Sequence, residues 1–273
     1  MKIIDCFIFY NELDLLNYRF SILNEFVDFF ILVEASHSFT GKEKKSYYYD
    51  NKDFFSEFID KIIYININDM PFIFPNIDYN RGNQWENEKH QRNCITRGIH
   101  KLSNLIKLSD EDIILIADLD EIPDPLILQK IKNNELLEQD CYSLEQDCYY
   151  YNLNSKKKNC WHAAKILSYK KYLEIQTDIH KFRGNEYPII KSGGWHLSYF
   201  GDSSFIQNKI QNFSHQELNI PTYTNLDEID NKIKNNIDLF NRNQNQNIIN
   251  INIIDNLYLP PKYDKYLTKY YEN

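Results

Sequence analysis

Three carboxylates stand directly after an apolar run in the first half of the chain. Asp118, Asp120 and Glu121 follow residues 113–117, Ile-Ile-Leu-Ile-Ala, and Pro123 closes the segment. Such an unbroken apolar run is typical of a strand buried on both faces of a parallel sheet. Ligands of open α/β sheets bind beyond the carboxyl ends of these strands. Carboxylates gathered there repel one another unless a cation offsets their charge, so the Asp-x-Asp pattern indicates Mg²⁺ or Mn²⁺ bound to nucleotide phosphates. A solvated acidic turn is the alternative interpretation.

Each of these carboxylates has an expected role. Asp120 is predicted to hold the metal, and Asp118 to hydrogen-bond the ribose or share the metal. Glu121 is expected to brace the turn or to take part in catalysis. No cationic side chain stands near Asp120 in the sequence. Its replacement by Ala is therefore expected to relieve repulsion and leave the fold intact.

A second polar cluster occupies residues 85–93, Trp-Glu-Asn-Glu-Lys-His-Gln-Arg-Asn, within a predicted helix. Arg92 is a candidate ligand of a phosphate or a base edge, because its planar guanidinium offers two parallel donors. The alternative is a helix-stabilising pair between Glu88 and Arg92, which are four residues apart.

Two glycines precede an aromatic residue and a histidine later in the chain. Gly193 and Gly194 permit a close approach of the backbone to a ligand. Trp195 offers a face to an acceptor sugar, and His196 is a candidate third ligand of the metal. If strand alternation holds, the two side chains point to opposite faces, so His196 faces the metal and Trp195 faces the acceptor or the core. A core tryptophan beside a hydrogen-bonded histidine is the alternative.

A general base can be sought among several acids. Glu217 is the preferred candidate, with His215 beside it as a second possible base or an acceptor contact. A helix cap or surface turn is the alternative interpretation of this segment. Asp147 and Asp202 are also eligible as the base.

The composition limits the function classes. The chain has 273 residues, 42% of them hydrophobic and 15% aromatic, which is enough for one large α/β domain. A formal net charge of −8 without a basic stripe argues against a nucleic-acid partner. Five cysteines without a Cys-x-x-Cys pair predict neither a disulfide framework nor a zinc site. The sequence shows no signal peptide and no apolar run that could span a bilayer, so a soluble cytoplasmic protein is expected.

Strands and helices are predicted to alternate over the first 120 residues. Apolar runs at 2–9, 29–33, 61–67 and 110–117 predict strands, and residues 13–23, 54–59 and 85–102 predict helices. Strand, helix and strand in succession imply parallel strands. Neither Gly-x-Gly-x-x-Gly nor a Walker-type motif is present, which disfavours dinucleotide and P-loop enzymes. Beyond residue 125 the pattern predicts three aromatic strands, at 142–153, 161–169 and 192–200, a helix at 226–240 and an Asn-rich tail.

Six segments occur in an order that resembles glycosyltransferase family 17, the β-1,4-mannosyl-glycoprotein β-1,4-N-acetylglucosaminyltransferases. The resemblance covers residues 3–240 and rests on 7–16 (FIFYNELDLL), 33–42 (with VEA and FTGK), 85–93 (WENE and QRN), 118–123 (DLDEIP), 193–199 (GGWHLSY) and 213–217 (FSHQE). It implies a GT-A (Rossmann-like) α/β fold with a mixed, mainly parallel central sheet. It also implies a UDP-sugar donor, UDP-GlcNAc in characterised members, and inversion at the anomeric carbon.

By the resemblance Asp118 and Asp120 match the family's Asp-x-Asp motif, and the following boundaries and contacts are expected beside it. Residues 1–240 are expected to form the catalytic domain, with a nucleotide-sugar half (1–123), an acceptor half (124–240) and a C-terminal extension (241–273) packing on the domain. A glycan or another hydroxyl compound is the expected acceptor, although the animal members' membrane anchor has no counterpart here. The predicted donor-binding residues are Asn11, Glu12, Glu34, Asn87, Arg92 and Asp118, and the predicted acceptor contacts are Trp195, Tyr150 and His215.

Two other function classes remain open from the sequence. A phosphohydrolase of the haloacid-dehalogenase type also places Asp-x-Asp after an apolar strand, although normally after the first strand. A non-catalytic carbohydrate-binding protein would explain the aromatic residues but not the acids at a strand end.

Overall fold

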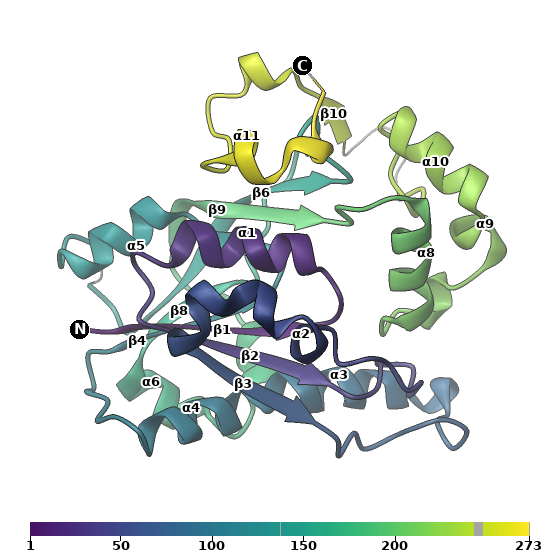
Figure 1. The fold of residues 1–273 in the computed structure, drawn as a ribbon. Coiled ribbons are helices and arrows are strands. Elements are labelled where there is room, and N and C mark those ends of the chain that lie inside the picture. Colours follow the sequence, from purple (N-terminus) through teal and green to yellow (C-terminus); the bar gives the residue numbers. More distant parts are fainter. Residues whose placement is uncertain (137, 243–247, 273) are drawn as a thin grey trace.

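Four parallel strands form the first half of the central sheet. The computed structural model describes residues 1–136, 138–242 and 248–272 (Figure 1). The strand order is β3-β2-β1-β4, and every pair in it is parallel. The bounds are β1 Ile3–Phe9, β2 Phe29–Ala35, β3 Ile62–Ile67 and β4 Ile113–Asp118. The carboxyl ends of these strands therefore meet at one edge of the sheet.

The second half of the chain extends this sheet with mixed pairings. Antiparallel β8 follows β4, β6 follows β8, and the long β9 runs parallel to β6 while also pairing with β5. Short β7 and β10 complete the far edge. The predicted α/β class with a mixed, mainly parallel sheet is confirmed. The bounds are β5 Glu121–Pro123, β6 Cys141–Tyr150, β7 Ser155–Lys157, β8 Lys165–Ser168, β9 Ile189–Ser198 and β10 Ile248–Asn250.

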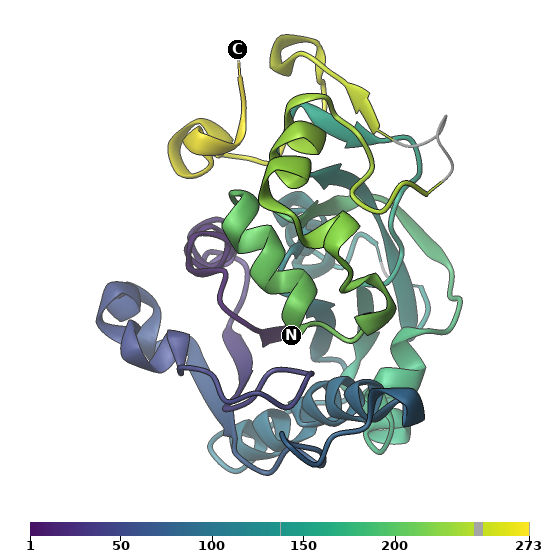
Figure 2. The same ribbon diagram turned by 90° about the vertical axis from the view of Figure 1, so that its right-hand side faces the viewer.

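Helices cover both faces of the sheet, and a helical group stands beyond its strand ends (Figures 1 and 2). The α-helices are α1 Leu13–Leu23, α2 Tyr47–Asp50, α3 Asn83–Asn93, α4 Ile95–Ser103, α5 Pro125–Lys132, α6 Tyr169–Ile175, α7 Ile179–Arg183, α8 Ser203–Asn212, α9 Pro221–Thr224, α10 Leu226–Lys234 and α11 Tyr263–Tyr266. The 3₁₀ segments are η1 Lys52–Lys61, η2 Tyr79–Arg81, η3 Gln216–Leu218, η4 Ile253–Asp255 and η5 Thr268–Tyr270.

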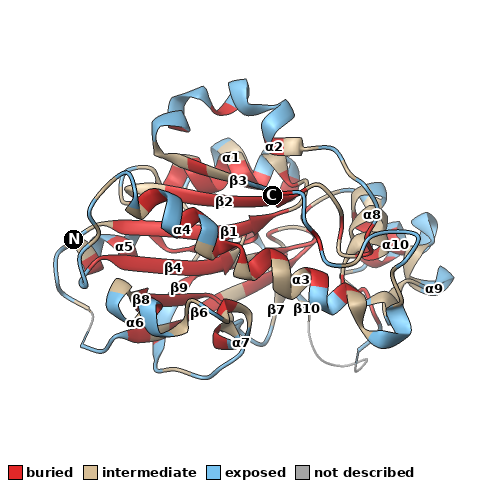
Figure 3. Cartoon of the chain, turned by 90° about the horizontal axis from the view of Figure 1, so that it is seen from below, coloured by how far each residue is buried: buried red, intermediate tan, exposed pale blue. Residues whose placement is uncertain are grey.

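Alternation along β1 divides the core into two layers. Phe7 and Phe9 pack in the cluster beneath α1, whereas Cys6 and Ile8 pack in the cluster beneath α4. Both faces of the strand are buried, as the unbroken apolar runs predict (Figure 3). A third, smaller cluster joins β6 to α8 and α10. Apolar burial on both faces therefore fixes the position of the strand ends.

The largest difference from the predicted elements lies in the helix expected over 85–102. It is two helices, α3 and α4, which separate at Cys94, where ψ is −5° and the backbone N–H bonds to carbonyls of the preceding turn. The break has a packing reason, since α3 carries mainly polar residues toward the strand ends while α4 packs apolar residues on the sheet. The helix expected over 226–240 likewise ends at Lys234.

The C-terminal segment packs on the domain and completes the core around α1. The ring of Trp195 lies against Tyr258, and the Trp195 indole N–H donates to the Tyr258 carbonyl over 3.1 Å. Tyr18 of α1 donates to the carbonyl of Pro261. Part of the Asn-rich stretch, residues 243–247, lies outside the described residues. The division of the chain at residues 123 and 240 stays a prediction.

Candidate active site

A buried arginine shapes the turn that carries the three carboxylates. Arg19 of α1 forms a two-bond ion pair with Asp5 of β1, at 2.8 and 2.6 Å. Its remaining nitrogen donates to the backbone carbonyls of Asp118, Leu119 and Glu121, at 3.1, 2.9 and 2.9 Å. Both Arg19 and Asp5 are fully buried. Three carbonyls held on one guanidinium fix the path of the backbone from β4 to β5.

Asp118 is held by two arginines from different elements. Arg92 of α3 and Arg183 of α7 each bring a nitrogen to 3.0 Å from its carboxylate. Burial alone would raise the pKa of Asp118, but Arg183 and Arg92 outweigh it and hold that pKa below its usual value. The Glu88–Arg92 pair, the alternative interpretation of this segment, also forms, at 2.9 Å. Arg92 therefore joins α3 to the turn after β4.

Asp120 lies between a lysine and a histidine. Its Oδ2 is 3.1 Å from Nζ of Lys209 on α8, and its Oδ1 is 3.6 Å from Nε2 of His196 on β9. Lys209 also lies 3.1 Å from Glu12. Burial would raise the pKa of Asp120, but Lys209 and His196 lower it overall. Three elements far apart in sequence thus converge on one carboxylate.

The position of His196 opposite this turn depends on a glycine. Strand β5 pairs with β9 so that Glu121 faces His196 and Pro123 faces Gly194. Gly194 has φ of +132°, and a Cβ there would lie 2.1 Å from the carbonyl oxygen of Ile122. No other residue fits this approach, and the close contact is with the backbone of β5, not with a ligand as the sequence suggested.

These side chains line one pocket of about 610 Å³ at the strand ends. Both acidic and cationic side chains line its wall. The acids are Glu12, Glu88, Asp118, Asp120, Glu121 and Glu217, and the cations are Arg92, Arg183, Lys209, Lys157 and Arg242. Its aromatic members include Trp85, Tyr150, Trp161, Tyr199, Phe213 and Phe240. The pocket therefore offers cations for an anionic group and rings for an apolar or sugar face.

The model of glycosyltransferase family 17 matches residues 1–252. The chain belongs to glycosyltransferase family 17. It is therefore a glycosyltransferase, an enzyme that acts on a sugar donor and an acceptor, and the resemblance drawn from the six segments is confirmed.

Solved structures similar to this family 17 chain include two of low identity. One is 4-diphosphocytidyl-2C-methyl-D-erythritol synthase from Anaerococcus prevotii, with 12% identity and a TM-score of 0.37 over 75% of this chain and 95% of that one. The other is the bifunctional IspDF from Campylobacter jejuni, with 10% identity and a TM-score of 0.36 over 78% of this chain and 54% of that one. No curated protein matches the chain. Within the described residues, no helix has the length and apolar character needed to cross a membrane.

A divalent cation fits two of the three predicted metal ligands. The 3.6 Å between Asp120 Oδ1 and His196 Nε2 is a separation that two ligands of one ion can have, with bonds of about 2.0–2.2 Å each. Asp118 does not fit this role, because both of its oxygens already accept from arginines. No group of three or more His, Cys, Asp or Glu side chains in the described part of the chain could hold a metal. A bound cation would therefore take its other ligands from substrate or water, as Mg²⁺ commonly does.

The protonation state of His196 affects whether it can bind a metal. Burial opposes charge on the ring, but Cys148 and Asp120 raise the pKa of His196 to about 10. Its Nδ1 lies 3.7 Å from the sulfur of Cys148, which leaves Nε2 toward Asp120. Because a metal needs the neutral imidazole, binding at this pair would displace a proton.

Glu121 braces the turn. It is 1% exposed and accepts hydrogen bonds from the Asp118 backbone N–H over 2.8 Å and from the Trp161 indole N–H over 2.5 Å. Arg183 forms an ion pair with it. The contacts of Glu121 therefore support the bracing role and do not support the catalytic role.

Two predicted donor-binding residues lie away from this pocket and hold structure instead. Asn87 is fully buried and bonds to backbone groups of Phe39 and Phe72, so it ties two loops together. Glu34 is fully buried and pairs with Lys44 at 3.0 Å. Neither is among the residues that line the pocket.

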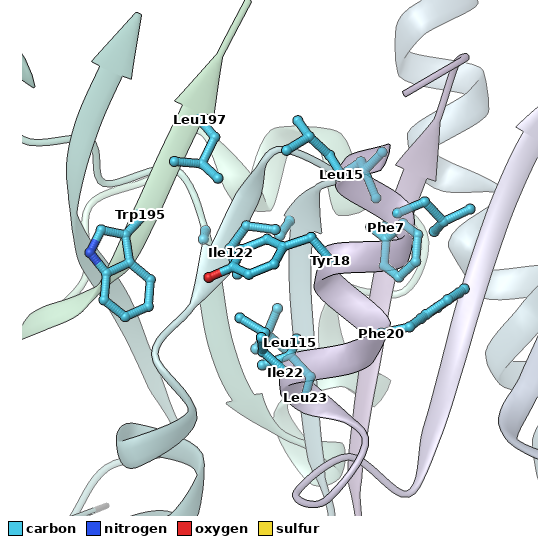
Figure 4. Packing of buried hydrophobic residues seen from close by; sticks show 14 of the residues in the cluster. Phe7, Leu15, Tyr18, Phe20, Ile22, Leu23, Leu115, Ile122, Trp195 and Leu197 are labelled. Atoms are coloured by element: carbon cyan, nitrogen blue, oxygen red, sulfur yellow. The ribbon is translucent and has the colours of Figure 1, made fainter. Parts of the chain in front are cut away.

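Of the other predicted donor and acceptor residues, some line the pocket and some do not. Glu12, Arg92, Tyr150 and His215 line it. Asn11 lines a different cavity, described below. Trp195 is 2% exposed and packs in the core beneath α1, so the acceptor contact assigned to it is wrong (Figure 4). The alternation argument explains this, since His196 takes the pocket face and leaves Trp195 the core face.

The candidate bases separate in the same way. Glu217 and His215 line the pocket and pair with each other, Nδ1 to Oε1, at 2.6 Å. Asp147 pairs with Lys156 at 2.5 Å, outside the pocket lining. Asp202 caps the start of α8 by accepting from the Phe205 N–H. Asp147 and Asp202 are therefore not suitable as the base.

Arg19, Arg183 and Lys209 are functional residues that the sequence did not single out. Arg19 falls within the apolar stripe of the helix predicted at 13–23. Arg183 and Lys209 stand in stretches of the sequence that carry no recognisable motif. Three acids at a strand end did imply cations, and Arg183 and Lys209 are cations that pair with them, whereas Arg19 binds the backbone carbonyls of the turn.

Proposed function

We propose that this chain transfers a sugar, GlcNAc in the first instance, from a UDP-sugar to a hydroxyl of a glycan, with inversion. The observation that carries the proposal is that Arg92, Arg183 and Lys209 converge on the acidic turn at the strand ends. The choice of UDP-GlcNAc rests on the family alone.

Each of the three cations is held by two acids, and the two arginines keep further donors with which the pocket can bind a diphosphate. Nε of Arg92 and Nε of Arg183 are buried and have no hydrogen-bond partner within the described ranges. Buried donors without acceptors are costly, so a phosphate oxygen that accepts from them would be favoured. Because negative charge grows on the diphosphate as the sugar bond breaks, these cations also stabilise the transition state.

A divalent cation, Mn²⁺ or Mg²⁺, held by Asp120 and His196 would supply further positive charge to the departing diphosphate. The chain's own contribution there is orientation. Lys209 holds one oxygen of Asp120 and so leaves Oδ1 toward His196.

Glu217 is the proposed base that removes the proton from the acceptor hydroxyl. Glu12, Glu88, Asp118, Asp120 and Glu121 are each paired with an arginine or a lysine, so their carboxylates are already engaged. Among the pocket acids of the described structure, Glu217 pairs with His215 only. Its side chain is 60% exposed, so an acceptor can reach it. The Tyr150 side of the pocket would then take the acceptor.

The test is a panel of nucleotide sugars incubated with the protein, with Mn²⁺ or with EDTA, with and without a mixture of neutral glycans. We expect release of UDP from UDP-GlcNAc that rises with the glycans, together with a glycan that is heavier by one sugar. Release of inorganic phosphate instead would support a phosphohydrolase, and consumption of another donor would overturn the donor assignment. Equal turnover in EDTA would overturn the metal requirement.

A further inference from the structure

A second cavity of about 630 Å³ lies beside the active-site pocket. Its walls are the start of α1 (residues 11–15), the segment 200–205 that leads into α8, and residues 269–272 of the C-terminal segment. Tyr151, Asn152 and Ile233 complete it. In Figures 1 and 2 the C-terminal segment lies above helices α1 and α8. The cavity, called the second pocket from here on, therefore joins parts of the chain that are far apart in sequence.

Aromatic rings form much of the wall of the second pocket. Tyr151, Phe200, Phe205, Tyr270 and Tyr271 line it; Phe205 and Tyr271 are partly exposed, and the other three rings are buried behind them. Rings on the wall of an open polar cavity offer flat apolar faces at a low entropic cost. A sugar ring, with C–H groups on its face and hydroxyls on its edge, matches such a surface.

The polar groups of the second pocket favour hydroxyls over anions. Asp14, Asp202, Glu12 and Glu272 line it, against a single cation, Lys269. Lys269 is already paired with Asp14. A phosphate or carboxylate ligand would meet net negative charge, whereas hydroxyl groups can donate to these acids.

Asn11, a residue on the wall of the second pocket, has a buried acceptor that lacks a donor. Oδ1 of Asn11 is buried and has no hydrogen-bond partner in the described part of the chain. Leaving a buried carbonyl oxygen unpaired is unfavourable, and a ligand hydroxyl that donates to it would remove that cost. The unpaired acceptor of Asn11 therefore favours a ligand with hydrogen-bond donors.

The second pocket adjoins the active site through Glu12. This residue lines both pockets and lies 3.1 Å from Lys209, which in turn contacts Asp120. We propose that the second pocket binds neutral sugar units of an oligosaccharide. The sugars are either further units of the acceptor or a separate glycan, and the first of these two sources rests on the proposed transfer reaction.

Binding can be tested without catalysis by titrating the full chain with neutral trisaccharides of mannose, glucose and GlcNAc, and with an oligosaccharide containing glucuronate. Tyr271→Ala removes a ring from the wall. Tyr263→Ala is the matched control. The ring centroids of Tyr263 and Tyr271 are 5.2 Å apart, but Tyr263 is not part of the pocket lining. We expect a neutral trisaccharide to bind the wild type, and Tyr271→Ala to weaken it about three- to ten-fold.

Tyr263→Ala should leave the affinity unchanged. Equal weakening by both variants, preference for the glucuronate compound, or no binding to the wild type would overturn the proposal. These readouts do not depend on donor turnover, so failure of the transfer reaction is seen separately in the nucleotide-sugar panel.

Kinetics then distinguish the two sources of the sugars. If the second pocket holds further units of the acceptor, Tyr271→Ala raises KM for an oligosaccharide acceptor but not for a monosaccharide acceptor, with kcat unchanged. If it holds a separate glycan, Tyr271→Ala weakens binding in the titration and leaves both KM values unchanged.

Discussion

Nζ of Lys209 lies 3.1 Å from Oδ2 of Asp120, although 89 residues separate them in the chain. The contact removes the repulsion that the sequence suggests for this acid, because α8 delivers a cation that the neighbouring sequence lacks. The pKa of Lys209 is raised by Asp120 and Glu12 in spite of burial, as expected of a lysine held by two acids.

Asp120→Asn should therefore abolish transfer and also destabilise the protein. The variant leaves Lys209 with Glu12 as its remaining acid, so we expect the free energy of unfolding to fall by about 1–3 kcal/mol. Urea unfolding monitored by tryptophan fluorescence measures this change. An unchanged or increased stability would show that repulsion among the carboxylates outweighs the contact between Asp120 and Lys209. Unchanged turnover in Mn²⁺ would overturn the role of Asp120.

Arg19→Met should lower stability more strongly, by about 3–5 kcal/mol, because it leaves Asp5 buried without its partner. A second variant, Arg19→Met with Asp5→Leu, removes both charges and should recover part of the stability. Activity should not recover with it, because the bonds to the three turn carbonyls are still missing. Recovery of activity in the double variant would show that Arg19 acts only through Asp5.

Glu217→Gln should reduce the transfer rate by about 10²- to 10⁴-fold, the usual contribution of a general base. Affinity for UDP should not change, since the side chain does not contact the arginines in the described structure. Single-turnover kinetics and calorimetry separate the two effects. Glu228→Gln, an exposed acid on α10, is the control and should retain full activity. A Glu217→Gln enzyme with a normal transfer rate would leave His215 as the next candidate.

His196→Ala should increase the Mn²⁺ concentration needed for half-maximal activity, with partial rescue at high Mn²⁺. Loss of one of two protein ligands lowers affinity for the ion more than it changes the chemistry. Electron paramagnetic resonance of Mn²⁺ with protein and UDP reports this binding independently of turnover. His100→Ala, at an exposed position on α4, serves as the control. Identical Mn²⁺ binding in both variants would exclude His196 as a ligand.

Trp195→Ala should cost about 3–5 kcal/mol of stability because it empties a site in the core. The folded fraction should retain its KM values for donor and acceptor, since the ring packs against Tyr258 and not in the pocket. Denaturant unfolding and steady-state kinetics at low temperature test both statements. A raised acceptor KM without loss of stability would return Trp195 to the acceptor site.

The sequence predicted the parts of this molecule that depend on local pattern. Apolar runs located the four parallel strands, and the carboxylates after Ala117 located the strand-end site. Alternation gave the opposite directions of Trp195 and His196. These inferences succeed because strand period and burial act on neighbouring residues.

Contacts between distant segments could not be predicted in the same way. Nothing local marks Arg183 or Lys209 as partners of Asp118 and Asp120, since their positions depend on how α7 and α8 dock. The donor-binding roles predicted for Asn87 and Glu34 were wrong for a related reason. A buried polar residue that ties loops together has the same sequence signature as one that binds a ligand, and only its partners distinguish the two.

The pairing of Gly194 with Pro123 also limits how this site can change in evolution. The lack of a side chain at position 194 lets β9 approach β5, and that approach sets the height of His196 relative to Asp120. A single added methyl group would push the strands apart before any functional side chain was altered. Variation in donor or acceptor preference is therefore open to the residues on the pocket wall, whereas position 194 remains restricted to glycine.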